Sequence, residues 1–276
     1  MTFAELVLQI NSKQSFLCIG LDADKSRIPK HLLKFEDPVT EFNRQIIESC
    51  EEFCVAFKPN TAFYESAGVS GWQTLQNTFN LLPENTLNIA DAKRGDIGNT
   101  STSYANAFFN KQSSGFDFDA ITVSPYMGAD SVKPFIAFQN KWVIILALTS
   151  NDSATDFQLL QTDQSVKMYQ KVLETAKIWG TKEQIMFVVG ATRPEYLTEI
   201  RKIVPDHFLL IPGVGAQGGS LHDVAKFGMN STVGLLANAS RSILFASDRE
   251  DFADAARAEA KKIQQEMKIL LETFAS

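Results

Sequence analysis

Short, continuous apolar runs alternate with longer segments of helical periodicity along the whole chain. An apolar run without internal polar positions is typical of a strand that is buried on both faces of a parallel sheet. Eight such strands are predicted, at residues 16–21, 54–57, 87–90, 120–123, 142–148, 185–189, 208–211 and 233–237. Helical spacing of apolar residues predicts helices at residues 3–10, 39–53, 72–82, 100–109, 164–179, 221–227 and 251–271, and one more that is capped by Thr192 with Pro194 in its first turn.

This alternation predicts a (β/α)₈ barrel that forms one domain over residues 1–276 and begins with a short leading helix. A doubly wound open sheet is the second possibility, but the first strand–helix unit lacks the Gly-x-Gly-x-x-Gly sequence of dinucleotide-binding folds. The longest irregular stretch, residues 149–162, is polar and predicts a mobile loop over a binding site.

Composition narrows the class of protein. The 276 residues are 45% hydrophobic and 21% charged, which is an ordinary balance for a globular protein, and the net charge of -6 argues against a general nucleic-acid binder. No stretch approaches the roughly 20 apolar residues of a membrane span, and the first residues do not resemble a signal peptide. The three cysteines, Cys18, Cys50 and Cys54, predict buried thiols in a reducing compartment, and we expect a cytoplasmic protein.

The most distinctive charged stretch follows the third predicted strand and reads Asp91-Ala92-Lys93-Arg94-Gly95-Asp96. Asp91 and Lys93 are two residues apart, so their side chains leave a continuing strand on the same face. Two carboxylates and one ammonium group this close in sequence favour each other's charged forms, which predicts a fixed electrostatic field. The alternative for an isolated cluster of this kind is a solvated turn with a surface ion pair.

Polar side chains also follow the other predicted strands. In a (β/α)₈ barrel, the active site lies at the carboxyl ends of the strands. The candidates at these ends are Asp22, Lys58, Asp91 with Lys93, Ser124, Ser150, Gln217 and Arg241. Each could instead be a turn or surface residue, and Asp24 competes with Asp22, which is preferred because it directly ends its strand. The three histidines end no strand and are predicted to be surface or loop residues.

A glycine-rich run after the seventh strand predicts an anion site. In the run from Pro212 to Gly219, several glycines precede a helix, so backbone N–H groups can converge on a phosphate. Arg241 follows the eighth strand, beside the position where many barrels hold a phosphate, and a guanidinium can donate paired hydrogen bonds to it. The alternative is a tight turn with Arg241 on the surface.

Taken together, these residues resemble the orotidine 5′-phosphate decarboxylase family. The signature Asp91-x-Lys93-x-x-Asp96-Ile97-x-x-Thr100 is similar to that family's, and so are the glycine-rich run and Ser240-Arg241-Ser242. The segments 57–60 and 93–96 resemble its longer bacterial branch, and the similarity spans all eight predicted strands. The resemblance implies decarboxylation of orotidine 5′-monophosphate (OMP) to UMP and CO₂, with neither a metal nor an organic cofactor.

The resemblance also implies roles for the charged residues. Lys93 would donate the proton to C6 of the pyrimidine, and Asp91 would lie near the departing carboxylate. Lys58 and Asp22 would complete the charge network and contact the ribose. Asp96 would reach into the neighbouring subunit's site, which implies a homodimer with shared active sites.

The remaining implied contacts concern the rest of the substrate. Thr100 would also reach the neighbouring subunit's site, and Ile97 would line the apolar side of the carboxylate pocket. Ser150 would bind the pyrimidine edge, and Gln217 and Arg241 would hold the phosphate. The loop at residues 151–158 is longer than in the family's more compact branch, so the contacts that this loop makes in the compact branch are not assigned to residues here.

Two other functions compete with this one. A Mg²⁺-dependent sugar-phosphate decarboxylase or aldolase of the same barrel type resembles the chain in its Asp-x-Lys-x-x-Asp element. A non-catalytic barrel that binds nucleotide phosphates would be expected to have lost Asp91, Lys93 or Asp96, and all three are present.

Overall fold

Eight parallel strands form a closed barrel in which each strand pairs with its neighbours in sequence. The computed structural model describes residues 1–163, 165–190, 195–214 and 219–275. The strands are β1 (Leu17–Gly20), β2 (Ala56–Lys58), β3 (Leu87–Arg94), β4 (Ala120–Val123), β5 (Trp142–Leu148), β6 (Ile185–Val189), β7 (Phe208–Pro212) and β8 (Leu235–Ala239). Pairing of β8 with β1 closes the barrel, which confirms the predicted (β/α)₈ fold.

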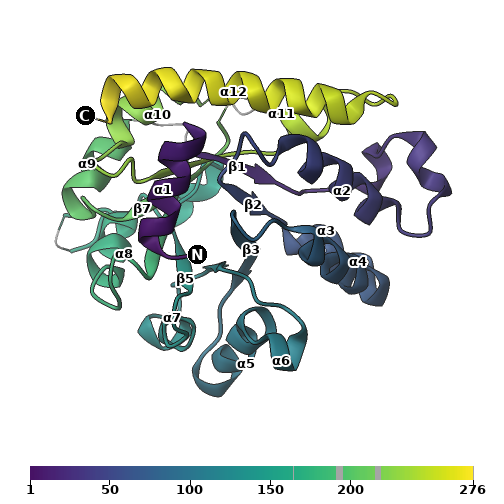
Figure 1. Cartoon of the computed structure of the whole chain (residues 1–276). Coiled ribbons are helices and arrows are strands. Elements are labelled where there is room, and N and C mark those ends of the chain that lie inside the picture. The colour runs from purple at the N-terminus through teal and green to yellow at the C-terminus, as the bar shows by residue number, and fades with distance from the viewer. Residues whose placement is uncertain (164, 191–194, 215–218, 276) are drawn as a thin grey trace.

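Helices surround the barrel because each apolar strand buries its outer face against an amphipathic partner (Figure 1). The helices are α1 (Phe3–Lys13), α2 (Pro38–Cys50), α3 (Thr61–Glu65), α4 (Gly68–Leu81), α5 (Gly98–Phe109), α6 (Lys111–Ser114), α7 (Ala129–Ile136), α8 (Met168–Ala176), α9 (Glu195–Ile203), α10 (Leu221–Gly228), α11 (Arg241–Leu244) and α12 (Phe252–Phe274). Three 3₁₀ helices are η1 (Lys25–Arg27), η2 (Lys30–Lys34) and η3 (Asp152–Asp156). None of the helices in these described ranges is long and apolar enough to cross a membrane.

The leading helix α1 covers the amino-terminal end of the barrel, opposite the end where the predicted site residues lie. Its Phe3 ring packs 5.3 Å from the ring of Phe208, the first residue of β7, and 6.1 Å from that of Trp142, the first residue of β5. The indole N–H of Trp142 donates to the Met1 carbonyl at 2.9 Å. The leading helix therefore closes the apolar core at that end.

Several strand boundaries differ from those predicted, and backbone conformation explains one of them. The eighth strand was predicted to begin at Val233, but Val233 and Gly234 have φ values of 69° and 64°, so they form a turn and β8 starts at Leu235. The second strand extends to Lys58, and the third extends beyond residue 90 to Arg94. The strand extensions place Lys58, Asp91 and Lys93 within strands rather than after them.

Several helical segments also differ from expectation, and the short helices α3, α6 and α11 were not predicted. The predicted helix at 164–179 is α8, which begins only at Met168 because the preceding chain turns back to pair Gln161 with Lys167. Gln164, Thr192 and Pro194 lie outside the described residues. Helix α7, which has Pro134 inside it, was not located from the sequence. The predicted irregular stretch 149–162 contains η3, and Gln158 Oε1 accepts from the Thr149 N–H at 2.7 Å.

His207 lies in a loop, in agreement with the predicted surface or loop position of the histidines, but its ring nitrogens are not exposed to solvent. It precedes β7, and both of its ring nitrogens are buried without a hydrogen-bond partner among the described residues. Its ring lies 5.5 Å from that of Phe187, and its carbonyl accepts from the buried Arg201 guanidinium at 2.6 Å. Burial, reinforced by the Arg201 charge, lowers the pKa of His207 to about 4. The folded protein therefore holds this imidazole neutral at moderately acidic pH.

Because His207 resists protonation in the folded protein, we expect the free energy of unfolding to fall in mild acid. The unfolded chain takes up a proton at the ordinary histidine pKa of about 6.5, whereas the folded chain does so only near 4. Stability is therefore full above about pH 6.5 and falls as the pH approaches 4. We expect the free energy of unfolding in urea to fall more from pH 7 to pH 5 in the wild type than in His207→Phe. Equal pH dependence of the two proteins would contradict the prediction.

Candidate active site

The charged cluster centres on Asp91, which lies at the carboxyl end of the barrel. Its Oδ2 accepts from Lys58 Nζ of β2 at 2.7 Å, and its Oδ1 accepts from Lys93 Nζ at 2.6 Å. Oδ1 also accepts from the Thr122 hydroxyl of β4 at 2.9 Å. Three adjacent strands thus bring together two ammonium groups and one hydroxyl around a single carboxylate. Thr122 was not among the predicted site residues, although it is the one polar residue in its apolar run.

Burial and charge together fix the ionisation of this cluster. Burial by itself would raise the pKa of Asp91, but Lys58 and Lys93 outweigh it and hold that pKa well below the ordinary value. Burial would likewise lower the pKa of Lys58, but Asp91 and then Asp22 outweigh it and raise that pKa. Both buried groups are therefore charged at neutral pH. Lys93 differs from these two groups because half of its side chain is exposed.

Asp22 follows β1 beside this cluster. The N–H of Leu21 donates to the Lys58 carbonyl at 3.0 Å, which holds the end of β1 against β2. The Oδ1 atom of Asp22 is buried and has no hydrogen-bond partner in the described part of the chain. Asp24, by contrast, caps η1 by accepting from the Ser26 N–H at 2.9 Å. This contrast supports Asp22 as the residue with acceptor capacity for a ligand hydroxyl.

Within one chain, Asp96 does not join the cluster, contrary to the mutual stabilisation expected from its closeness in sequence. Its Oδ1 accepts from the Ile97 N–H at 2.7 Å, and the second ammonium group on Asp91 belongs to Lys58. The loop after β3 points its residues outward: Ile97 is 55% exposed, and Thr100 in the first turn of α5 is exposed. The chain reaches this arrangement because Gly98, with φ of 56°, reverses the backbone at the start of α5.

Ser150 lies just beyond β5, beside the end of β6. A Cβ atom at Gly190 would stand 2.8 Å from the Ser150 backbone nitrogen, so only glycine allows the two strand ends to approach this closely. Thr149, its neighbour, is held by Gln158, whose Nε2 donates to the Thr149 hydroxyl at 2.8 Å. The loop from β5 is thereby anchored next to Ser150.

The predicted phosphate side lies at the ends of β7 and β8. Val214 pairs with Gly219 across the glycine-rich run, and Gln217 lies outside the described residues. Arg241 is the first residue of α11 and is exposed. A Cβ atom at Gly20 would stand only 2.0 Å from the Ser240 hydroxyl oxygen. The Ser240 side chain, next to Arg241, therefore packs directly against the glycine at the end of β1.

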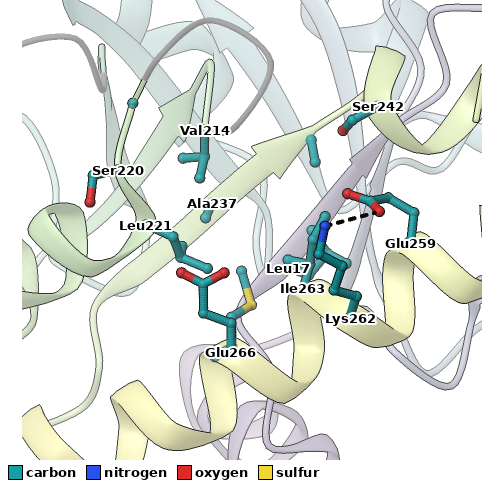
Figure 2. A pocket seen from close by; sticks show the side chains of 13 residues that line it. Leu17, Val214, Ser220, Leu221, Ala237, Ser242, Glu259, Lys262, Ile263 and Glu266 are labelled. Carbon is teal, nitrogen blue, oxygen red and sulfur yellow. Dashed lines mark ion pairs between the residues drawn. The ribbon is translucent and has the colours of Figure 1, made fainter.

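A separate cavity of about 330 Å³ is lined by residues of β1, β8 and α12, and it is not the candidate site. Figure 2 shows it between α12 and the strands, with Leu17, Ala237 and Ile263 on its sides and a Glu259–Lys262 ion pair of 3.7 Å at one edge. The charged cluster around Asp91 lines no part of it. In the described ranges, no three or more His, Cys, Asp or Glu side chains are grouped to hold a metal ion.

Comparison with known proteins identifies the family. Residues 15–256 match the family described as orotidine 5′-phosphate decarboxylase / HUMPS. The orotidine 5′-phosphate decarboxylase of Flavobacterium johnsoniae is 55% identical over 276 residues, and the alignment covers 99% of each chain.

Solved structures agree with this similarity. Leishmania donovani OMP decarboxylase has a TM-score of 0.79 and 34% identity, covering 96% of this chain and 99% of that one. Leishmania donovani UMP synthase has a TM-score of 0.84 and 35% identity over 98% of this chain, which spans just over half (56%) of the synthase. From the length of the match and the identity, the chain belongs to the orotidine 5′-phosphate decarboxylase / HUMPS family.

Proposed function

We propose that this protein decarboxylates OMP to UMP and CO₂, with Lys93 as the proton donor. The observation that carries the proposal is the ammonium group of Lys93, a half-exposed side chain, held 2.6 Å from a buried, ionised Asp91 at the carboxyl end of the barrel. The curated relative at 55% identity has the same activity in its name.

The chemistry follows from the charges. As the bond from C6 to the carboxylate breaks, the electron pair stays on C6 and CO₂ leaves. A preorganised ammonium group beside C6 stabilises this charge and then transfers a proton to the carbon. Lys93 becomes neutral and regains a proton from solvent. Asp91, which is held ionised, would lie near the substrate's own carboxylate and disfavour the bound ground state.

The other candidate residues would hold the remainder of the nucleotide. Lys58 and Asp22, whose buried Oδ1 has no hydrogen-bond partner among the described residues, suit the ribose hydroxyls. Ser150 would bind the edge of the pyrimidine. Gln217 and Arg241 would hold the phosphate, whose binding energy can keep a loop closed over the ring.

The proposed active unit is a homodimer. Ile97 and Thr100 are exposed in a single chain, Asp96 is partly exposed, and Met127, which lies beside Gly95 of the same loop, is 45% exposed. An exposed apolar surface that carries candidate site residues is typical of an interface between subunits. In the dimer, Asp96 and Thr100 would enter the partner's site, and Ile97 would line the pocket for the departing carboxylate.

A direct assay tests the function. OMP is added to the purified protein in EDTA, and conversion to UMP is followed by ultraviolet absorbance. Rapid conversion is expected, and it should be lost in a Lys93→Ala control. A folded protein that leaves OMP unchanged, yet acts on sugar phosphates when Mg²⁺ is added, would favour the competing metal-dependent barrel enzymes.

Arg241 gives a separate prediction about the phosphate. Arg241→Ala should raise KM for OMP by about 10- to 100-fold, because charge-assisted hydrogen bonds to the phosphate are lost. It should hardly change turnover of orotidine, which lacks the phosphate. Arg249→Ala, another exposed arginine on the connection to α12, serves as the matched control and should leave both substrates unaffected. Equal losses on OMP and orotidine would argue against a phosphate contact.

A further inference from the structure

The backbone of β3 is irregular at the site. Ala90 aligns with Ile121 of β4 and Arg94 with Val123, so residues 91, 92 and 93 together stand opposite the single residue Thr122. Bulges of this kind bend a strand and redirect its side chains, and they recur beside active sites. Both Asp91 and Lys93 lie inside this bulge, so its geometry determines how their side chains meet.

Lys93 has a backbone conformation that a lysine does not favour. Its φ is 46°, in the left-handed region, which is unfavourable for a residue with a Cβ atom. The neighbouring contacts must stabilise this conformation. One of them is direct, because the Lys93 N–H donates to the Thr122 hydroxyl oxygen at 2.9 Å.

The same hydroxyl contacts the carboxylate of the cluster. Thr122 Oγ1 lies 2.9 Å from Asp91 Oδ1, the atom that also accepts from Lys93 Nζ. An ionised carboxylate only accepts hydrogen bonds, so the hydroxyl must donate to it. The donors and acceptors of these two hydrogen bonds are therefore fixed: the Lys93 N–H donates to the Thr122 hydroxyl, and that hydroxyl donates to the Asp91 carboxylate. The Thr122 side chain is buried, so water does not compete for either bond.

We propose that Thr122 is a positioning residue for the reaction, one whose hydroxyl holds both the backbone of Lys93 and the carboxylate that receives its ammonium group. The proposal rests on the proposed function, since it is the Lys93 proton that must reach C6. Thr122 itself would not touch the substrate. Its effect would come through the placement of Lys93, and misplacement of a reacting group by about 1 Å can cost about 10²-fold in rate.

Three variants separate positioning from packing. Thr122→Val keeps the shape and removes the hydroxyl, whereas Thr122→Ser keeps the hydroxyl and removes the methyl group. Thr86→Val is the matched control, because Thr86 is also buried and hydrogen-bonded but precedes β3 at the other end of the barrel. We expect Thr122→Val to lower kcat about 10²-fold with KM nearly unchanged. Thr122→Ser should stay near the wild-type kcat, and so should Thr86→Val.

Hydrogen exchange of the Lys93 amide, measured by NMR, gives a readout that does not depend on turnover. The amide should be protected in the wild type and in Thr122→Ser, and it should exchange faster in Thr122→Val. If the wild type leaves OMP unchanged, the proposed function fails, and this exchange pattern alone decides whether Thr122 holds Lys93.

Three results would overturn the positioning role. One is a wild-type kcat in Thr122→Val, and another is an equal loss of kcat in Thr122→Val and Thr86→Val. The third is an unprotected Lys93 amide in the folded wild type. This third test needs only the wild-type protein, so it can be made even if Thr122→Val does not fold.

Discussion

Lys93→Ala should lower kcat for OMP decarboxylation by about 10⁴-fold or more, because general-acid catalysis and electrostatic stabilisation are lost together. UMP should still bind, because Lys58 keeps Asp91 paired at 2.7 Å and the other candidate contacts remain. The measurement is steady-state turnover of OMP, together with UMP titration by calorimetry.

Two further variants sharpen this test. Lys93→Arg keeps the positive charge but does not release a proton near neutral pH, so it should also be severely impaired. Lys202→Ala, on the exposed face of α9, removes a surface lysine and should behave as the wild type. Turnover in Lys93→Ala within a few-fold of the wild type, checked with thoroughly purified protein, would remove Lys93 from the reaction.

Mixing two inactive variants should restore activity if the site is shared between subunits. Lys93→Ala and Asp96→Ala should each be nearly inactive alone. In a mixed dimer, one site combines an intact Lys93 with an intact Asp96 from the partner subunit. Random exchange makes half of the dimers mixed, with one of their two sites intact, so about a quarter of the wild-type activity should return. The measurement is OMP turnover after subunit exchange, which mass spectrometry of differently labelled chains verifies.

The structure supplies a matched control for this experiment. Lys58, Asp91 and Lys93 contact one another within a single chain. A mixture of Lys93→Ala and Lys58→Ala should therefore recover nothing, because every site in the mixed dimer lacks one of the two lysines. Recovery in this control, or none with Asp96→Ala despite proven exchange, would contradict the proposed arrangement.

The fold could be predicted from the sequence because its signal is local and repeated. Continuous apolar runs such as residues 142–148 indicate strands buried on both faces, and their alternation with helical segments leaves few topologies. Element ends were less certain. The misplaced start of β8 reflects the turn at Val233 and Gly234, whose positive φ values depend on the surrounding structure. A β-branched valine gives no local signal for such a turn.

The candidate site was predicted in part. The positions of Asp22, Lys58, Asp91 and Lys93 at the ends of strands follow from the rule that parallel barrels place their sites there. The partner that pairs with Asp91 was harder to predict from the sequence. Lys58 is 33 residues away in sequence, and only the parallel alignment of β2 with β3 brings it to 2.7 Å. Asp96, only five residues away, accepts from the Ile97 N–H instead.

The sequence by itself therefore determined the barrel, the end of it that carries the charges, and the residue types available for the chemistry. The tertiary structure alone decided which of these groups touch. The bulge in β3, the left-handed backbone of Lys93 and the contact of both with Thr122 arise from pairing between β3 and β4. A single threonine in an apolar strand has no periodicity to mark it, because its role depends on partners 29 and 31 residues away.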